Sequence, residues 1–421
     1  MSLEFKYYKI DDIGEVVSGG TPSTSKNEYW YGDIGWITPK DLSSYDDIYI
    51  SRGERNISSE GLNNSSAKLV PKNTVLMTSR APIGYIAIAN NELSTNQGFK
   101  SLICDEKICH YKYFYYWLKL NIKYIINNSN GSTFKEISGG TFKNLEISLP
   151  SISEQKAISS VLWTIDEKIS VLKKINRNLE QLSQNLFKKW FINFDLKNDF
   201  NIFESFKESS LGKIPESWEI KTIGDLSEVK GRIGWRGYTT NDLVDEGPWV
   251  VGGKEITSGF IDFNSAKHLT REKYEESPEI MLKDKDLIIA KTGTIGPIAM
   301  YYDVYGEATL NPNVGLIRSK NIVPALLLTF FKTQRAQYYL NEFTTSSVQP
   351  AINQTTIKQL EIALPSDKDL LNTIGSKFEE INLLQFNLNE EIKKLQRLRD
   401  TLLPKLMSGE IDVSEINCDL E

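Results

Sequence analysis

The sequence predicts an α+β protein in which two β-rich domains are joined by two long antiparallel coiled-coil helices, arranged as an internal pseudo-twofold duplication. Three observations lead to this prediction. A short segment occurs twice, each copy is followed by a helix-capping pattern, and each cap leads into a heptad repeat. The chain has 421 residues, 40% hydrophobic and 25% charged, which is a globular composition. At about 150 residues per domain this length allows two or three domains, and the duplication selects two.

The repeated segment ends each β-rich domain. Residues 141–150 read TFKNLEISLP and residues 356–365 read TIKQLEIALP, so the numbering of the two copies differs by a constant offset of 215 (356 minus 141). Apolar and polar side chains alternate towards the end of both copies, which is typical of a half-buried strand. The final proline cannot continue a ladder of hydrogen bonds. Each domain is therefore expected to end on a strand.

A capping box is expected directly after each strand. Ser151 and Glu154 in the first half, and Ser366 and Asp369 in the second, have the spacing at which a serine hydroxyl and an acid satisfy the free amides of a helix start. Each strand should therefore lead straight into a helix.

The two predicted helices carry heptad seams, in which apolar residues advance by alternating steps of four and three. Helices of roughly 33 to 38 residues are about 50 to 57 Å long. Polar residues interrupt the seams at Asn176, Ser183, Gln385 and Arg399, where they either set the register or face a helix of another chain. The seams are related by an offset of 216 (374 minus 158), which indicates one extra residue after the second cap. The apolar seam consists of Ile158, Leu162, Ile165, Ile169, Leu172, Leu179, Leu186 and Trp190 in the first helix, and of Ile374, Phe378, Ile381, Leu388, Ile392, Leu395 and Leu402 in the second.

These patterns divide the chain into six segments. A polar, irregular stretch after the first helix is expected to be a linker that returns the chain to the second domain. The predicted segments are a first domain at 1–150, a central helix at 151–194, the linker at 195–215, a second domain at 216–365, a C-terminal helix at 366–411 and a tail at 412–421.

Basic residues and two hydroxyl-bearing residues in turns are candidate contacts to a nucleic acid. Residues 74–89 and 286–302 both read as strand, loop and strand, and Arg80 and Lys291 stand at apparently equivalent places in these loops. Arg and Lys can donate to phosphate or to guanine O6 and N7, whereas the alternative is a plain hairpin with a solvated cation. The candidates are Thr21, Ser23, Lys40 and Arg80 in the first domain, and Arg232, Arg236, Lys254 and Lys291 in the second.

Composition restricts the chemistry of the chain. The net charge of −6 argues against DNA binding through bulk positive charge, so basic residues must cluster locally or another subunit must supply them. With two histidines and three cysteines, the sequence offers no zinc pattern, disulfide framework or catalytic triad. Nucleotide-binding glycine motifs are missing as well. We therefore expect no catalytic residue, metal or cofactor in this chain, no membrane span, and a cytoplasmic location.

Several motifs resemble those of specificity subunits of type I restriction-modification systems. They are fairly specific, and the resemblance covers nearly the whole chain. The second domain departs from it, because KGRIGWR at 230–236 stands where the first domain has GGTPS. The motifs are Gly19–Thr24 (GGTPST), Tyr29–Asp33 (YWYGD), Trp36–Leu42 (WITPKDL), Ser79–Gly84 (SRAPIG), the LEISLP and LEIALP strand ends, and Leu395–Ile411 (LQRLRDTLLPKLMSGEI).

The resemblance implies a non-catalytic subunit of a host-defence system. Its two target-recognition domains would each read one half of a split sequence in double-stranded DNA, with the helices as a ruler. It would dock two modification subunits, which bring S-adenosylmethionine and methylate adenine, and restriction subunits that use ATP and Mg²⁺. A helix of about 50 Å spans roughly 15 base pairs. The competing interpretation is a coiled-coil scaffold whose duplicated domains bind protein, which the acidic net charge favours. A stand-alone nuclease or methyltransferase is disfavoured by the missing motifs.

Overall fold

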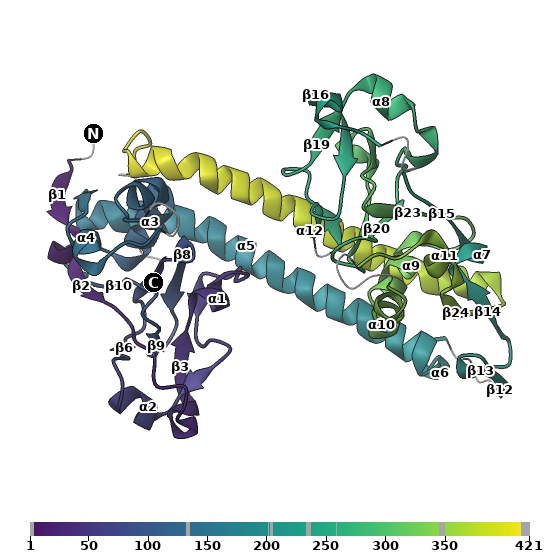
Figure 1. The fold of residues 1–421 in the computed structure, drawn as a ribbon, viewed down its shortest axis with the longest axis horizontal. Coiled ribbons are helices and arrows are strands. Elements are labelled where there is room, and N and C mark those ends of the chain that lie inside the picture. Colours follow the sequence, from purple (N-terminus) through teal and green to yellow (C-terminus); the bar gives the residue numbers. More distant parts are fainter. Residues whose placement is uncertain are drawn as a thin grey trace. The chain divides into compact units, whose positions relative to one another are not determined.

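The computed structural model describes residues 4–131, 135–200, 202, 205–232, 237–257, 259–344 and 350–413. The chain forms two compact units. Unit 1 comprises Met1–Leu172 and Glu391–Glu421, and unit 2 comprises Lys173–Glu390. Each unit therefore combines one β-rich domain with a segment from each of the two long helices (Figure 1). Within the described residues, no helix is long and apolar enough to cross a membrane.

Two sheets and a pair of strands form the β structure of unit 1. The larger sheet has the order β2-β10-β7-β8-β4, the smaller one has the order β5-β3-β9-β6, and β1 pairs with β11. The strands are β1 (Lys6–Lys9), β2 (Gly14–Val17), β3 (Trp30–Ile37), β4 (Tyr49–Ile50), β5 (Asn56–Ile57), β6 (Leu69–Val70), β7 (Val75–Ser79), β8 (Ile83–Ala89), β9 (Leu93–Thr95), β10 (Ser101–Cys104) and β11 (Glu146–Leu149).

The main core of unit 1 lies between the larger sheet and the helices. One buried cluster contains Met77 and Leu102 on the sheet, Phe114 on helix α3 (Tyr111–Asn127) and Ile158 on helix α5 (Ile152–Phe187). Helix α3 packs on β8 and β7 (Figure 1), which fixes the loop between these two strands. The short helices are α1 (Pro39–Leu42), α2 (Ser59–Asn63) and α4 (Gly139–Lys143), and α3 spans Tyr111–Asn127.

Unit 2 repeats this plan. Its larger sheet has the order β15-β23-β20-β21, its smaller one has the order β19-β16-β22, and β14 pairs with β24. The strands are β14 (Trp218–Thr222), β15 (Ser227–Lys230), β16 (Leu243–Val251), β17 (Ile256–Thr257), β18 (Phe260–Ile261), β19 (Lys267–Leu269), β20 (Leu287–Ala290), β21 (Ile298–Met300), β22 (Ala308–Leu310), β23 (Val314–Ser319) and β24 (Glu361–Pro365). The helices are α7 (Ile223–Leu226), α8 (Arg271–Glu275), α9 (Pro324–Phe331), α10 (Gln334–Glu342) and α11 (Gln354–Gln359).

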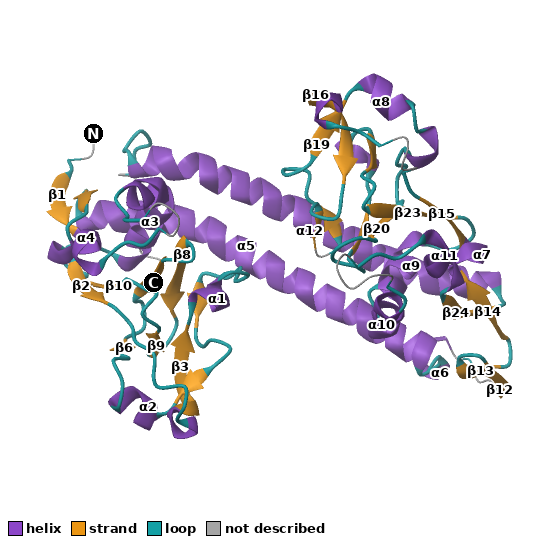
Figure 2. Ribbon diagram, viewed as in Figure 1, coloured by secondary structure: helices purple, strands orange, loops and turns teal. Residues whose placement is uncertain are grey.

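Strand pairing confirms the internal duplication. The repeated segments form β11 and β24, and each pairs antiparallel with the first strand of its domain, β1 or β14. The smaller sheets share an unusual feature, a parallel pair among antiparallel neighbours, in β3 with β9 and in β16 with β22. The strand orders β2-β10-β7-β8 and β15-β23-β20-β21 also correspond. Both domains combine helices and strands (Figure 2), and the predicted α+β class is confirmed.

The second long helix begins one residue later, relative to the strand before it, than the first long helix does. Helix α5 (Ile152–Phe187) has the predicted capping box, because the Ser151 amide donates to Glu154 Oε2 at 2.9 Å. A turn of π-helix at Lys188–Ile192 continues it. Helix α12 spans Lys368–Met407. The predicted box of Ser366 and Asp369 is wrong, because Asp367 Oδ1 accepts the capping bond from the Asp369 amide at 2.9 Å. The extra residue that shifts the seam to an offset of 216 thus also moves the cap (367 minus 151).

The long helices pair antiparallel within each unit. In unit 1, Arg399 Nη1 lies 2.7 Å from Asp166 Oδ1. In unit 2, Gln385 Nε2 donates to the carbonyl of Asn176 at 3.4 Å. All apolar residues of the two predicted seams are buried or half-buried. Helix α12 also accommodates Pro404 in its last turn.

The segment between the domains has more structure than the polar linker predicted from its composition. Residues 195–215 include helix α6 (Lys197–Phe200) and the antiparallel hairpin of β12 (Phe206–Ser209) and β13 (Gly212–Pro215). Apolar residues within it cause the difference, since Leu196 and Ile214 are buried in the core of unit 2.

Candidate nucleic-acid interface

Loops at one end of the sheets in unit 1 converge on a single surface. The Gly20 amide donates to the carbonyl of Thr95 at 2.9 Å, and the Ser79 amide donates to the carbonyl of Gly98 at 2.7 Å. These bonds tie together the loops that follow β2, β7 and β9. We call this surface the first loop cluster; it comprises residues 18–23, 38–40, 80–83, 95–100 and 135–139.

The glycine pair of the GGTPS motif shapes the first loop cluster. A Cβ on Gly19 would lie 2.0 Å from the carbonyl oxygen of Thr95, and a Cβ on Gly20 would lie 2.3 Å from the carbonyl carbon of Ser66. Because backbone lies on both sides, only glycine fits at these positions. The buried indole of Trp36 then donates to the Gly20 carbonyl at 2.9 Å. The motif is thus a structural clamp that presents the next residues at the surface.

The candidate residues that follow the clamp are exposed. Thr21 donates its hydroxyl to Gln97 Oε1, which brings it onto the turn after β9. Ser23 lies 2.9 Å from the hydroxyl of Ser25. Lys40 is exposed and forms an ion pair with Glu54 at 2.7 Å. An exposed pair of this kind holds its partners weakly, so Lys40 is available to exchange its carboxylate for a phosphate.

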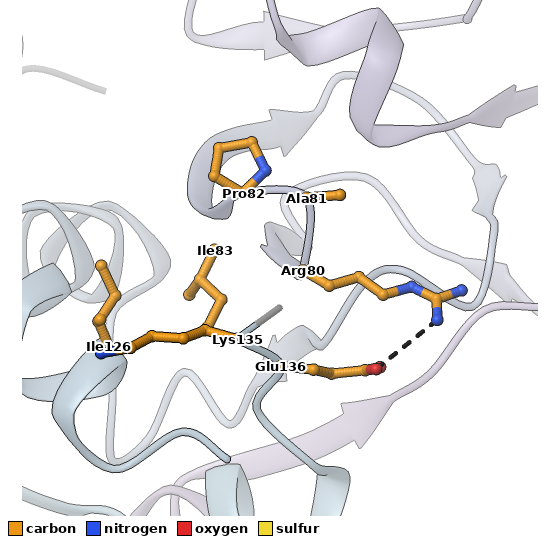
Figure 3. A pocket seen from close by; sticks show the side chains of 7 residues that line it. All are labelled: Arg80, Ala81, Pro82, Ile83, Ile126, Lys135 and Glu136. Carbon is orange, nitrogen blue, oxygen red and sulfur yellow. Dashed lines mark ion pairs between the residues drawn. The ribbon is translucent and has the colours of Figure 1, made fainter. Parts of the chain in front are cut away.

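Arg80 lines a cavity of about 500 Å³ (Figure 3). Its Nη1 atom lies 3.6 Å from Glu136 Oε2, and both side chains are partly exposed. Glu136 and Lys135 line one part of the cavity, whereas Pro82, Ile83 and Ile126 supply apolar surface. The cavity therefore offers a charged edge beside an apolar wall, a combination that can contact the edge and methyl groups of a base.

Lys100 is a residue of this cluster that the sequence prediction missed. It is 7% exposed and donates to the carbonyl of Phe99 at 3.2 Å. Burial lowers its pKa, and the nearby Arg80 lowers it further, while Glu136 acts in the opposite direction. Its place beside a strand made it look like an ordinary lysine in the sequence.

Unit 2 has an equivalent surface, which we call the second loop cluster. The side chain of Asn311 accepts a hydrogen bond from the Asn313 amide at 2.8 Å, as Asn96 accepts one from Gly98 at 2.9 Å in unit 1. The described part of the second loop cluster comprises residues 231–232, 252–255, 291–297, 311–313 and 350–354. Lys254 is exposed and Lys291 is half-buried.

The two arginines predicted as contacts in the second domain are Arg232 and Arg236. Arg232 is 5% exposed and donates Nε to the carbonyl of Leu310 at 2.8 Å and Nη2 to Thr309 Oγ1 at 3.2 Å. Because its guanidinium is occupied by these acceptors within unit 2, Arg232 supports the fold and is not the exposed contact that was predicted. Arg236 lies outside the described residues.

Arg80 and Lys291 are not equivalent, contrary to the sequence prediction. Arg80 is bridged to Glu136, and the matching bridge in unit 2 joins Thr292 to Ala351. The carbonyl of Lys291 accepts from the Ile352 amide at 2.9 Å, as the carbonyl of Ser79 accepts from the Ile137 amide at 3.0 Å. Lys291 therefore occupies the place of Ser79. Among the described residues, no group of three or more His, Cys, Asp or Glu side chains could hold a metal ion.

Comparison with known proteins identifies the family. The family described as type I restriction modification DNA specificity domain matches residues 3–181 and 215–394. The MjaIX specificity subunit of Methanocaldococcus jannaschii is 35% identical, over 97% of this chain and 94% of that protein. The EcoBI specificity subunit of Escherichia coli is 20% identical, over 75% and 69% of the two chains. The crystal structure of a type I S subunit from M. genitalium has the same fold, with a TM-score of 0.59, 16% identity and coverage of 96% of both chains. The chain belongs to the family of type I restriction-modification DNA specificity proteins and contains the family domain twice.

Proposed function

We propose that this chain is the DNA-reading specificity subunit of a type I restriction-modification complex, and that each loop cluster reads one half of a split target. One observation carries the proposal: the two loop clusters share backbone hydrogen bonds but carry different side chains. The backbone hydrogen bonds that follow β7 and β9 recur after β20 and β22. At equivalent positions, Arg80 corresponds to Thr292, and the buried Gly98 corresponds to the exposed Asn313. Two different sets of side chains on one frame are what two different half-sites require.

The chemistry of the complex is assigned to partner subunits. We infer that this chain is not catalytic, and that S-adenosylmethionine, ATP and Mg²⁺ are bound by the methyltransferase and restriction subunits. The relatives are themselves named as subunits of restriction enzymes. Exposed apolar residues on the long helices, such as Leu182, Leu383 and Leu384 in unit 2, support the docking of two methyltransferase subunits. Since the chain would act on the DNA of its host, we expect it in the cytoplasm.

The spacing of the two half-sites follows from the helices. Helix α5 has 36 residues, which corresponds to about 54 Å at about 1.5 Å per residue. We therefore propose an unread spacer that brings the half-sites to a separation of roughly 15 base pairs, at about 3.4 Å per pair.

Methylome sequencing of cells that express the chain with its methyltransferase subunits tests the proposal. We expect one methylated motif made of two half-sites. Replacing Arg80 by Gln should relax or weaken recognition in one half-site only, by about 1–3 kcal/mol if Arg80 pairs with a guanine. Lys72→Gln is the matched control, because Lys72 is exposed and lies at the opposite end of β7. A single continuous motif would overturn the two-reader proposal.

The competing protein-binding scaffold makes a different prediction. In a gel-shift experiment with the reconstituted complex, the proposed function requires retention of the target duplex in preference to a duplex with altered half-sites. Retention of no duplex favours the scaffold, whereas equal retention of all duplexes contradicts sequence-specific reading.

A further inference from the structure

Each loop cluster contains a lysine that is largely removed from water and that, among the described residues, has no carboxylate within ion-pair distance. Lys100 is 7% exposed, and the only acceptor of its ammonium group among the described residues is the carbonyl of Phe99. Lys291 is half-buried, and its ammonium group has no acceptor within the described part of the chain. Burial lowers the pKa of both lysines. Keeping a cation in such a place is costly unless an anion accompanies it.

The two lysines come from different strands. Ser79 and Lys291 are equivalent, because their carbonyls accept the matching bonds from Ile137 and Ile352. The Ser79 amide donates to Gly98 and the Lys291 amide donates to Asn313. Counting two residues onward from these acceptors makes Lys100 equivalent to Gly315. The lysine therefore lies directly before β10 in unit 1, but directly after β20 in unit 2.

Their ammonium groups nevertheless reach the same corner. In unit 1, a Cβ on Gly139 would lie 3.7 Å from Lys100 Cε and 4.0 Å from Ser18 Oγ. In unit 2, a Cβ on Gly231 would lie 3.5 Å from Lys291 Nζ and 3.3 Å from the side-chain amide of Gln354.

These contacts involve matching positions. The strand pairs Val16 with Leu102 and Val229 with Ile317 make Ser18 equivalent to Gly231. The repeat offset of 215 makes Gly139 equivalent to Gln354. We call this place, between the end of β2 or β15 and the start of α4 or α11, the lysine corner.

Resting on the proposed function, we propose that each lysine corner binds a phosphate of the DNA backbone, so that Lys100 and Lys291 anchor the two domains independently of base sequence. In unit 1, the negative charge of Glu136 and the positive charge of Arg80 both act on Lys100, and Glu136 also forms an ion pair with Arg80 at 3.6 Å. A phosphate would supply a second anion for these two cations. The chain carries a net charge of −6, so two local anchors supply attraction that the chain as a whole does not. Base reading is then left to the exposed residues around each corner.

The salt dependence of DNA binding tests this role. With the reconstituted complex and its target duplex, Lys100→Gln and Lys291→Gln should each reduce the slope of log K against log salt by about 1. Binding should weaken by a similar factor on target and altered duplexes, and the methylated motif should stay the same. Lys72→Gln and Lys283→Gln are the matched controls. Both lysines are exposed, and they precede β7 and β20 at the ends away from the loop clusters.

A relocation experiment separates an anchor from a structural lysine. The double variant Lys291→Ser with Gly315→Lys moves the lysine of unit 2 to the strand that carries it in unit 1. A Cβ fits at this position, because its nearest neighbour would be Ile289 Cγ2 at 3.5 Å. The salt slope should return to that of the unmodified complex.

Five outcomes are distinguishable. A reduced slope in the single variants that is restored by relocation supports the anchors. A lowered melting temperature with an unchanged slope overturns them, because the lysines are then structural. An unchanged slope with lost binding of methyltransferase subunits also overturns them, in favour of a partner carboxylate. If the unmodified complex prefers no duplex, the proposed function itself fails, whereas a bipartite motif with unchanged slopes refutes only the anchors.

Discussion

The two units place different polar groups at the same position of their helix pairs. In unit 1, Asp166 is 4% exposed and accepts hydrogen bonds from Arg399 Nη1 at 2.7 Å and from Tyr116 Oη at 2.8 Å. The helix offset of 216 relates Asp166 to Asn382 (382 minus 166) and Ser183 to Arg399 (399 minus 183). A buried ion pair in unit 1 thus corresponds to neutral groups in unit 2.

The neutral groups of unit 2 are satisfied separately. Asn382 Oδ1 accepts from Tyr302 Oη at 2.6 Å, and the hydroxyl of Ser183 lies 2.9 Å from that of Thr329 on α9. In both units the polar groups at these positions have hydrogen-bond partners, but only unit 1 uses charged side chains. This difference makes the two units unequally vulnerable, because a buried carboxylate that loses its cation is left with a large desolvation penalty.

Removing the cation of unit 1 should have the largest effect. Arg399→Met leaves Asp166 buried without its ion pair and should destabilise unit 1 by about 3–5 kcal/mol. Ser183→Ala, the matched change in unit 2, should cost about 1 kcal/mol. Hydrogen exchange of each unit, monitored by mass spectrometry, measures both effects. The double variant Asp166→Asn with Arg399→Met should recover most of the loss, and equal destabilisation by the two single changes would contradict this comparison.

The tyrosine hydroxyls should differ in the same direction by less. Tyr116→Phe removes a hydrogen bond to a carboxylate, which should cost about 1.5–3 kcal/mol, whereas Tyr302→Phe removes one to an amide and should cost about 0.5–1.5 kcal/mol. Urea unfolding of the two variants gives these values from the shift of each transition. A larger loss for Tyr302→Phe would show that the charge of Asp166 is already met by Arg399 alone.

Acid should weaken unit 1 through His110. Burial lowers the pKa of His110 to about 4, with help from Lys112 and Lys156. The unfolded chain, with an ordinary His pKa of about 6.5, then binds a proton that folded unit 1 does not bind. Stability is therefore complete above about pH 6.5 and falls as the pH drops from there towards 4, by at most about 2 kcal/mol after allowance for solvent screening. Unfolding at pH 7 and pH 4.5 should show this loss in the unmodified chain and a smaller one in His110→Gln.

The helix caps should show the smallest effects and test the displaced start of α12. Ser151→Ala and Asp367→Ala each remove a cap and should cost about 1 kcal/mol. Ser366→Ala should change stability by less than about 0.5 kcal/mol, because Ser366 lies one residue before the cap of α12. Thermal unfolding ranks the three variants, and a loss for Ser366→Ala as large as that for Asp367→Ala would place the helix start at the residue predicted from the sequence.

Local patterns in the sequence predicted the long helices and the strands before them. The heptad seams show the period of a helix, and the alternation in residues 141–150 shows the period of a strand. Because the unit is repeated, each of these patterns occurs twice in the chain. The cap of α12 was missed because one added residue leaves Ser366 with the right spacing to an acid. Only the hydrogen bond of Asp367 shows which residue begins the helix.

The loop clusters were less predictable because their residues meet across strands. Arg80 and Lys291 looked equivalent, but the strands that carry them are related by the step from Val75 to Leu287 (287 minus 75), which is shorter than the step between the repeated segments (356 minus 141). This difference between the two offsets is invisible without the pairing. Burial of Arg232 by β22 and the approach of Lys100 to Gly139 are likewise tertiary contacts, which no local pattern reports.

The division of each long helix between the units determines the order in which the chain can fold during synthesis. Unit 2 is contained in one continuous stretch, Lys173–Glu390, whereas unit 1 needs Glu391 and the residues after it. At about 5–20 residues per second, the ribosome takes about 10–45 s to proceed from residue 172 to residue 391. During that time Ile158 and Leu162 lack the residues of α12 that belong to their buried cluster, and Asp166 lacks its ion-pair partner Arg399. The N-terminal unit is thus the last to be completed.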